Sequence, residues 1–330
     1  MSGIFTFPDV IDNHTAVCEF QPNKSPYSSH FPHTMQQLYP CFSWWNNARN
    51  QNKRNVLIMN TPIKKGKEFV NGFMMALANN TSSFDLLVDK IEEYKKFNSS
   101  VHVGNKPGGA YKMHHPNDAN MMRQIILDYN NITSSVVENN NHFNHNSNNN
   151  NNNLTILPTA ADDVECKKEL GMPVIGFLNR HISSGRYVTN HASIIKALEE
   201  ELYPNNNKNS SEVTATTTTT TSAGVHYLSS FDGLSFQEQI AFMHKIDILI
   251  GPHGAQLTSV PFIPECGGIL ELFSTGYYKP GFFGSLSRST GHYHISYYTG
   301  NITNRVEEVL VGSQTIEARI KLIILMQIQM

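Results

Sequence analysis

The sequence predicts an α/β protein built on parallel sheets, and three observations support this prediction. Short apolar runs of strand length alternate with segments whose apolar residues repeat every three or four positions, as on one face of a helix. The 330 residues are 39% hydrophobic, which is enough for two compact α/β units. Two polar low-complexity tracts, at residues 139–153 and 205–222, divide the apolar segments into blocks.

The alternation is most regular in the second half of the chain. Four apolar runs are expected to be strands: residues 173–178, 225–228, 246–250 and 268–273. Three helices are expected between them. One is capped by Asn190 and has Ile194, Ile195, Leu198 and Leu202 on one face. Another follows a capping box of Ser235 and Glu238, and a short third covers residues 254–260. This order, β-α-β-α-β-α-β, is that of a doubly wound parallel sheet.

The first half is less regular. Its first 52 residues contain five prolines and are expected to be irregular. Residues 55–59 are a candidate buried strand, and residues 68–79 are a candidate helix with an apolar face of Phe69, Phe73, Met74 and Leu77. A second helix is expected over residues 115–129, with an apolar face of Met121, Ile125 and Ile126. The alternation suggests an open α/β sheet in this half as well.

The two polar tracts predict the domain organisation. Both tracts are too polar to offset the entropy lost on ordering, so both are expected to be disordered loops. The asparagine-rich tract at 139–153 is interpreted as a linker, which predicts an N-terminal domain over residues 1–153 and a C-terminal domain over residues 154–330. The Asn/Ser/Thr tract at 205–222 is interpreted as an insertion between a helix and the next strand.

Charge and cysteine content argue against several classes of partner and of metal site. With 25 basic and 27 acidic residues, the formal net charge is −2, so nothing indicates nucleic acid or an anionic membrane surface as partner. An anionic ligand must therefore be bound by a local group of residues. The four cysteines form no C-x-x-C pair, which argues against a structural zinc site and leaves room for one or two disulfides in an oxidising compartment.

The compartment is left open by the residues themselves. Asn-x-Ser/Thr triplets recur along the chain, either by chance in an Asn- and Thr-rich sequence or as acceptors in a secreted protein. The first 18 residues do not resemble a signal peptide, and no run reaches the roughly 20 apolar residues of a membrane span. The protein is therefore expected to be soluble, or to reach a membrane only through an anchor absent from this chain.

Candidate binding residues follow the expected strands at their carboxyl ends, where open parallel sheets bind ligands. Gly251 and Gly254 flank His253 in the loop after residues 246–250, and the amides of Gly254 and Ala255 open the next helix. Glycines let the backbone approach a ligand, and a helix start with its dipole favours a diphosphate, to which His253 could donate a further hydrogen bond. The alternative is a tight turn without a ligand.

Polar residues after two other strands complete this candidate site. Asn179 and Arg180 follow the strand ending at residue 178, and Arg186 lies across a short Ser-Ser-Gly loop. Two guanidinium groups would form a cationic pocket for a diphosphate, unless they are ordinary surface arginines. Glu271 interrupts the apolar run 268–273, where it either accepts hydrogen bonds from ribose hydroxyls or points to solvent.

These motifs, in this order, resemble a known family. The string Asp247-Ile-Leu-Ile-Gly-Pro-His-Gly-Ala-Gln-Leu-Thr-Ser, followed by Phe262-Ile-Pro and Ile269-Leu-Glu-Leu-Phe, is similar to the C-terminal signature of family 61 glycosyltransferases. These include plant β-1,2-xylosyltransferases, xylan arabinosyltransferases and the O-linked GlcNAc transferases of the secretory pathway. The resemblance extends upstream to Phe177-Leu-Asn-Arg and Arg186-Tyr-Val-Thr-Asn, and covers about residues 173–298.

The resemblance implies a GT-B-like fold, in which two Rossmann-like domains face a cleft. It implies inverting transfer of xylose, arabinose or GlcNAc from a UDP-sugar to a glycan or glycoprotein acceptor, in the Golgi or endoplasmic reticulum lumen. No cofactor is required on this view, and because no Asp-x-Asp motif is present, transfer is expected to be metal-independent. The N-terminal domain would hold the acceptor. Two departures, Gln256 and Ser259 in place of the family's usual Gly and Asn, affect the expected details of donor binding.

The resemblance also assigns roles to the site residues. Arg180 and His253 are expected to be catalytic, and the donor-binding residues are expected to be Asn179, Arg180, Arg186, Gly254, Ala255, Gln256 and Glu271. A general base is expected from the N-terminal domain, with His114, His115 and Asp118 as candidates. The alternatives are a catalytically inactive glycan- or nucleotide-sugar-binding protein on the same fold, and a Rossmann oxidoreductase, which the absence of a G-x-G-x-x-G motif after an early strand disfavours.

Overall fold

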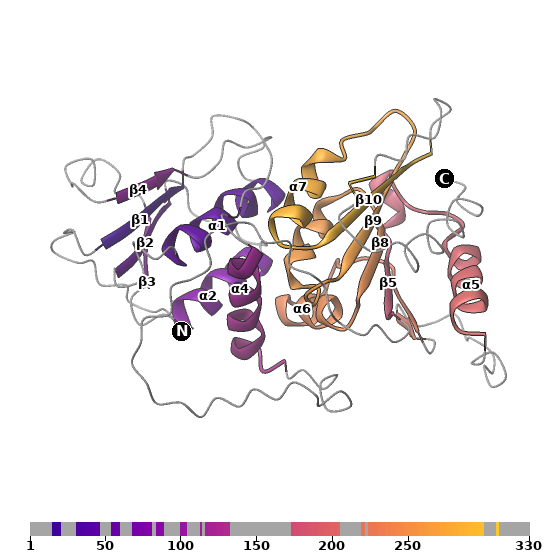
Figure 1. Cartoon of the computed structure of the whole chain (residues 1–330), viewed down its shortest axis with the longest axis horizontal. Helices are drawn as coiled ribbons and strands as arrows, with labels where there is room; N and C mark the ends of the chain where they lie inside the picture. Colours follow the sequence, from indigo (N-terminus) through magenta and orange to yellow (C-terminus); the bar gives the residue numbers. More distant parts are fainter. Residues whose placement is uncertain are drawn as a thin grey trace.

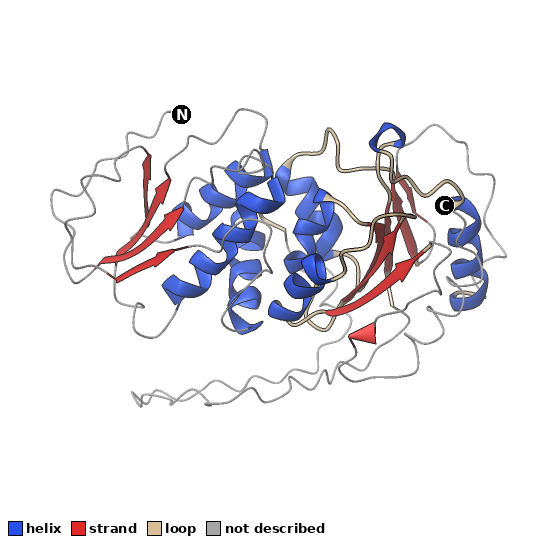
Figure 2. Cartoon of the chain, turned by 90° about the horizontal axis from the view of Figure 1, so that it is seen from above, coloured by secondary structure: helices blue, strands red, loops and turns tan. Residues whose placement is uncertain are grey.

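The structure is a computed structural model, and it describes residues 15–20, 31–46, 54–59, 68–80, 84–88, 100–103, 113, 116–132, 173–204, 219–221, 224–299 and 308–309. These residues form two sheets, one in each half of the chain, with helices packed between them (Figures 1 and 2). The predicted α/β class, with a Rossmann-like unit in each half as in a GT-B-like fold, is confirmed. The boundary at residues 153 and 154 lies outside the described residues, so the domain limits and the cleft stay predictions.

The N-terminal sheet has four parallel strands in the order β3-β2-β1-β4. Their bounds are β1 Thr15–Phe20, β2 Arg54–Met59, β3 Phe84–Val88 and β4 Ser100–Val103. This is the order of the first four strands of a Rossmann fold. Helices α1 (Phe31–Asn46), α2 (Glu68–Asn80) and α4 (Pro116–Tyr129) lie on the side of this sheet that faces the C-terminal half (Figure 2).

One prediction for this half was wrong, and another was wrong at one residue. Residues 1–52 were expected to be irregular, yet they contain β1 and the 16-residue helix α1. Pro32 lies in the first turn of α1, where no donor is missed, and the cost of Pro40 inside the helix is offset by burial of Met35, Leu38 and Tyr39. Of the apolar face predicted for α4, Ile126 is buried and Ile125 is partly buried, but Met121 is 48% exposed and the neighbouring Met122 is buried instead.

The C-terminal sheet has the strand order β11-β10-β9-β8-β5-β7-β6. Its central strands β5 (Ile175–Leu178), β7 (Val225–Leu228), β8 (Ile248–Pro252), β9 (Gly268–Phe273) and β10 (Tyr293–Tyr298) are all parallel. The edge strands β6 (Thr219–Thr221) and β11 (Glu308–Val309) pair antiparallel. The five parallel strands follow the flavodoxin-like order of a doubly wound sheet. A doubly wound parallel sheet was predicted, but with four strands, because β10 was not among them.

The helices of this half cover both faces of the sheet. Helix α5 (His191–Leu202) lies on the outer face, whereas α6 (Phe236–His244), the 3-10 helix η3 (Ala255–Phe262) and α7 (Gly281–Ser289) lie towards the N-terminal half (Figure 1). The predicted capping box of Ser235 and Glu238 is confirmed, with both of its hydrogen bonds present. Asn190 occupies the predicted N-cap position of α5, but its side chain makes no capping hydrogen bond.

The threonine tract departs from its predicted disorder at one point. Residues 219–221 of the tract form β6, which pairs with β7. Threonine is a β-branched residue that favours strands, and the edge of β7 offers unpaired backbone groups. Residues 205–218, and the whole asparagine tract at 139–153, lie outside the described residues.

One apolar core joins the two halves. Phe69 and Phe73 of α2, with Met122 of α4, belong to the same buried cluster as Phe236 of α6 and Phe262 of η3. The rings of Phe69 and Phe236 meet edge to face, with their centroids 4.9 Å apart. A separate cluster fills the space between α5 and the outer face of the C-terminal sheet.

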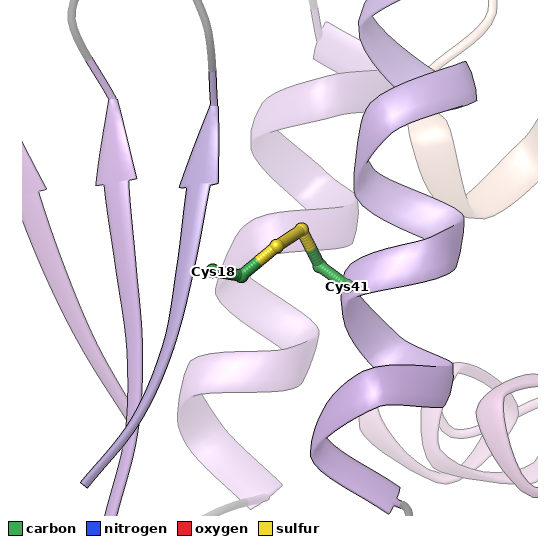
Figure 3. The surroundings of a disulfide bond; sticks show 2 residues. All are labelled: Cys18 and Cys41. Carbon is green, nitrogen blue, oxygen red and sulfur yellow. A yellow bond between two sulfur atoms is a disulfide. The ribbon is translucent and has the colours of Figure 1, made fainter. Parts of the chain in front are cut away.

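A disulfide joins β1 to α1 (Figure 3). Cys18 and Cys41 are fully buried, and their Cα atoms are 5.7 Å apart. Cys266 is also disulfide-bonded. Among the described residues, no helix has the length and apolar character needed to cross a membrane.

Candidate functional site

Asn179 shapes the loop that follows β5. Its side chain is fully buried, and its amide oxygen accepts hydrogen bonds from the backbone N–H groups of Arg180 and Val188, both at 3.0 Å. Its amide nitrogen donates to the Val188 carbonyl at 3.1 Å. This closes residues 180–188 into a loop whose turn requires a left-handed Gly185, with φ of 74°. Arg180 and Arg186 stand at the two ends of that loop.

Arg180 connects this loop to the one that follows β8. Its Nη1 donates to the His253 carbonyl at 2.9 Å, and its Nε donates to Ser184 Oγ at 3.1 Å. Gly254 lies directly against the guanidinium group, because a Cβ atom at this position would collide with Arg180 Nη1. β5 and β8 are neighbours at the topological switch point of the sheet, where doubly wound folds bind ligands. The two predicted loops therefore meet at that point.

Three cations gather at this edge, and we refer to Arg180, Arg186 and Lys279 as the cation group. The ring of Tyr277 contacts two of them, with Arg186 Cζ 5.0 Å and Lys279 Nζ 5.5 Å from its centroid. Arg186 Nη1 is buried and makes no hydrogen bond to any described residue. Burial lowers the pKa of Arg180, and the nearby Arg186 lowers it further, against the opposing effect of Asp232. The edge is therefore positively charged and holds an unused donor.

A buried carboxylate lies beneath the cation group. Glu271 of β9 has 0% exposure, and each of its oxygens contacts a histidine ring. Oε1 lies 2.5 Å from His253 Nδ1, and Oε2 lies 2.7 Å from His294 Nε2. We refer to these three residues as the Glu271 cluster. The suggestion that Glu271 points to solvent is wrong, and no described group other than the two histidines hydrogen bonds to it.

Strand register explains how the Glu271 cluster forms. Glu271 pairs with Gly251 on β8 and with Ser296 on β10, both of which are small. His253 and His294 are each two residues from these positions, so they lie on the same face of the sheet and reach the carboxylate diagonally. The far side of His253 faces the loop after β9, where its Nε2 lies 3.3 Å from the hydroxyl of Tyr277.

Burial sets the protonation of these groups. Burial, together with the charges of Arg186, Arg180, Lys279 and His294, lowers the pKa of His253 to about 3. Burial, with a smaller effect of Arg288, lowers the pKa of His294 to about 4. Burial also raises the pKa of Glu271 well above its usual value, against the opposing effect of Arg186. Burial therefore opposes charge on every member of the cluster, whereas the surrounding cations favour a negative one.

The comparison with protein families decides the identity. The model of the family described as "Glycosyltransferase 61" matches residues 31–270. The chain belongs to this family. The match confirms the family predicted from the C-terminal motifs, and with it a transferase. It begins at the first residue of α1 and ends one residue before Glu271, so it also covers the described helices of the N-terminal half.

Solved structures are similar to this family 61 member at low identity. TibC of enterotoxigenic E. coli, described as an iron-containing dodecameric glycosyltransferase, matches at 10% identity with a TM-score of 0.32, and the match covers 82% of this chain and 60% of that one. A family 9 glycosyl transferase of Veillonella parvula matches at 6% identity with a TM-score of 0.34, covering 86% of each chain. This chain thus spans about 60% of the length of TibC. No curated protein sequence matched.

Most of the predicted donor-site residues of this family 61 chain lie together. Arg180, Arg186, His253, Gly254 and Glu271 converge at the β5–β8 edge. Two others brace its loops. Gln256 accepts from Phe231 N at 2.6 Å and donates to the Asn179 carbonyl at 2.6 Å, and Asn179 holds the loop described above. Ala255 begins η3. Contact of any of these residues with a donor stays a prediction.

Of the three candidate bases, the structure describes Asp118. His114 and His115 are outside the described residues. Asp118 is buried, and its two oxygens accept hydrogen bonds from Ser43 Oγ and Asn46 Nδ2, both at 2.6 Å. These bonds join α4 to α1, which is a structural role for this carboxylate. Among the described residues, no group of three or more His, Cys, Asp or Glu side chains is arranged to hold a metal, and metal independence stays a prediction.

Three residues of the site were missed: Tyr277, Lys279 and His294. The alternation in Tyr293-His-Ile-Ser-Tyr-Tyr could have placed His294 on one face of a strand beside Glu271. Tyr277 and Lys279 lie in the loop 274–280, at the carboxyl end of β9, as the predicted residues lie at the carboxyl ends of β5 and β8. The same rule, applied to β9, would have found them.

Proposed function

We propose that this chain is an inverting glycosyltransferase that moves a sugar from a UDP-sugar to a glycan or protein acceptor. The observation that carries the proposal is the convergence of the cation group at the switch point of the C-terminal sheet. A nucleoside diphosphate leaving group needs such charge, because negative charge builds on it as the glycosidic carbon is attacked. Family 61 membership supports sugar transfer as the reaction.

The cations would act on the leaving diphosphate in different ways. Arg180 is held at both ends of its guanidinium group, so it would stabilise charge without having to reorganise. Arg186 has a buried Nη1 that makes no hydrogen bond within the described chain, and a phosphate oxygen could accept one from it. The amides of Gly254 and Ala255 at the start of η3 would add further donors. On this proposal the reaction needs no metal, since protein cations neutralise the diphosphate.

The sugar and the acceptor are proposed from the family resemblance alone. We propose xylose, arabinose or GlcNAc as the transferred sugar, with the acceptor bound by the N-terminal half. We also propose a location in the lumen of the secretory pathway, for which the buried Cys18–Cys41 disulfide is support, because disulfides persist in oxidising compartments. Protease protection of the tagged chain in intact microsomes tests the location, and digestion without detergent would contradict it.

A donor panel tests the activity. The purified chain is incubated with UDP-xylose, UDP-arabinose and UDP-GlcNAc, and sugar transfer, UDP release and donor binding are measured with and without EDTA. We expect transfer from one donor in EDTA. Binding without turnover would instead support an inactive nucleotide-sugar-binding protein on the same fold.

Substitution of Arg180 tests the proposed role of the cation group. We expect Arg180→Ala to lower kcat by about 100- to 1000-fold, as does removal of one preorganised donor in other enzymes. The control is Lys196→Ala, which removes a cation from the exposed face of α5, where its side chain is 76% exposed. Equal activity in the two variants, with unchanged thermal stability, would remove Arg180 from the mechanism.

A further inference from the structure

The contacts of the Glu271 cluster define how many protons it holds and where they lie. Its two short contacts join Glu271 Oε1 to His253 Nδ1 and Glu271 Oε2 to His294 Nε2, so each contact holds one proton. When the cluster holds only these two protons, Glu271 is ionised and both histidines are neutral donors. The remaining nitrogen of His253, Nε2, then carries a lone pair. A third proton would enter at that nitrogen, or at Nδ1 of His294, and would make the cluster neutral.

His253 Nε2 is directed at one hydroxyl group. Tyr277 Oη lies 3.3 Å from it, so in the two-proton state the tyrosine donates and the histidine accepts. The imidazole packs against Phe273 and Phe283, with ring centroids 5.0 Å and 5.2 Å apart, and these contacts hold it in this orientation. In this state His253 cannot donate to a diphosphate, the role suggested by the sequence, because a lone pair and a phosphate oxygen repel each other.

We propose that the Glu271 cluster, reached through the hydroxyl of Tyr277, accepts the proton that the acceptor hydroxyl loses during sugar transfer. This inference rests on the proposed function. As the acceptor oxygen forms its bond to the anomeric carbon, the bond from that carbon to the diphosphate oxygen breaks, and the electron pair leaves with the diphosphate. The acceptor proton passes to Tyr277 Oη, and the tyrosine's own proton passes to His253 Nε2. The cluster then holds three protons and is neutral, until it returns one to solvent.

The surroundings suit a group that takes up a proton. Burial favours the neutral three-proton state, whereas nearby cations favour the negative two-proton state. The charged and titratable groups that face the cluster are Arg180 and Arg186 from the loop after β5, Tyr277 and Lys279 from the loop after β9, and Arg288 from α7. In the two-proton state these cations stabilise the negative charge of the cluster, and the cluster loses that buried charge when it takes up the third proton.

In this arrangement Glu271 is a positioning residue, since it acts on the reaction only through His253. It sets the tautomer of His253 and balances the charge of the imidazolium, as the carboxylate does in a Ser-His-Asp triad. His294 occupies the second oxygen of Glu271, so the carboxylate is held from both sides. The same proton acceptor would serve any sugar acceptor that reaches Tyr277, which leaves acceptor choice to the N-terminal half.

The isosteric variant Glu271→Gln tests this inference. A glutamine keeps the shape but brings one amide oxygen and one NH₂ to the two histidines, so one histidine must change tautomer and the negative charge is lost. We expect kcat to fall by about 100- to 10,000-fold, the usual contribution of a general base, with unchanged affinity for UDP. We also expect the fall of wild-type kcat at acid pH to disappear. An unchanged pH profile with a normal kcat would overturn the proposal.

Tyr277 provides a matched pair of variants. Tyr277→Phe keeps the ring that contacts Arg186 and Lys279 and removes only the hydroxyl, whereas Tyr277→Leu removes the ring as well. We expect Tyr277→Phe to lower kcat and leave the affinity for UDP unchanged, and Tyr277→Leu to weaken both. Normal kcat in Tyr277→Phe would exclude the hydroxyl as the proton path.

Nitrogen-15 NMR of histidine-labelled protein separates failure of this inference from failure of the proposed function. In the wild-type chain we expect His253 to carry its proton on Nδ1, and the signals to be assigned by comparison with Glu271→Gln. A proton on Nε2 of resting His253 would overturn the inference even if sugar transfer is observed. Absence of transfer from every donor, with the Nδ1 tautomer present, would instead count against the proposed function.

Discussion

At the scale of single residues, Gly254 is required because a neighbouring side chain occupies the space beside it, and not because its backbone conformation demands glycine. Its φ of 173° is extended backbone that any residue adopts, so its conformation does not require glycine. What requires glycine is Arg180, whose Nη1 occupies the space that a Cβ atom would fill. The sequence suggested that Gly254 allows close approach of a ligand. In the structure, the missing side chain of Gly254 also leaves space for a group of the protein itself, the guanidinium of Arg180.

We therefore expect Gly254→Ala to act through Arg180. The guanidinium must move and lose its hydrogen bond to the His253 carbonyl, so affinity for UDP should fall by about 10- to 100-fold, the value of a bond to a charged group. Calorimetric titration measures this. Gly281→Ala is the control, because a Cβ atom there meets nothing within 4 Å. Combined with Arg180→Ala, the Gly254 substitution should add little, and fully additive losses would contradict the coupling.

Two of the residues predicted for the site lie just after a strand. Arg180 and His253 do so, and the rule that ligands bind at carboxyl ends was sufficient to find them. The partners of Glu271 could not be found in this way. His294 reaches it only because β10 lies beside β9 in register, and the sequence predicted neither β10 nor its place in the sheet.

At the scale of elements, His292 fastens the turn between α7 and β10 to the end of η3. Its Nε2 donates to the Ile263 carbonyl at 3.0 Å, and its Nδ1 accepts from Thr290 Oγ1 at 2.8 Å, so the neutral ring is fully hydrogen bonded. Burial, with a further effect of Arg123, lowers the pKa of His292 from 6.5 to about 4. The folded protein therefore resists a proton that the unfolded chain accepts.

This difference predicts a loss of stability in acid. Between pH 6.5 and about 4 the unfolded chain binds one more proton at His292 than the folded chain, so stability falls as the pH is lowered through this range. The slope from this residue approaches about 1.4 kcal/mol per pH unit. His292→Gln keeps a donor for Ile263 but does not titrate. We expect its unfolding free energy, from urea denaturation at several pH values, to depend less steeply on pH, and parallel curves would refute this.

Helices and strands were predicted correctly where a clear apolar pattern was accompanied by local signals for where the element begins or ends. The strand over residues 268–273 and the helix after Ser235 are examples, because burial and capping act locally. Helix α1 was missed because its stability comes from contacts distant in sequence. Tyr39 donates to the Thr258 carbonyl at 2.7 Å and packs edge to face on Phe73. Neither contact can be predicted from the local sequence around Pro40.

At the scale of the whole molecule, the helices of both halves share one interface. Arg123 of α4 is its main polar link and is buried, with 7% exposure. Its Nη1 donates to the carbonyls of Ile263 at 2.7 Å and Pro261 at 3.3 Å, at the end of η3, and its Nη2 donates to Asn120 at 2.7 Å. The cost of burying this cation is evident in its pKa, which burial lowers to about 10. The cation is retained because it satisfies carbonyls that the end of η3 leaves unpaired.

The shared core and this link predict that the two halves unfold together. Trp44 and Trp45, the only tryptophans, lie on α1, so tryptophan fluorescence reports the N-terminal half, whereas binding of UDP would report the C-terminal half. We expect both to be lost at the same urea concentration. Arg123→Met should lower the unfolding free energy by about 2–4 kcal/mol, because it removes the buried hydrogen bonds of a charged donor to the Pro261 and Ile263 carbonyls, and should move both curves equally.

Gln124→Ala is the control for this substitution, since Gln124 lies on the exposed side of the same helix and hydrogen bonds only to Asp128 among the contacts described. It should leave both curves in place. Two separate transitions in the wild-type chain, or a shift of the fluorescence curve alone in Arg123→Met, would mean that the halves are independent in stability. The donor site at the β5–β8 edge would then not depend on α4, and the N-terminal half could be exchanged between family members without loss of donor binding.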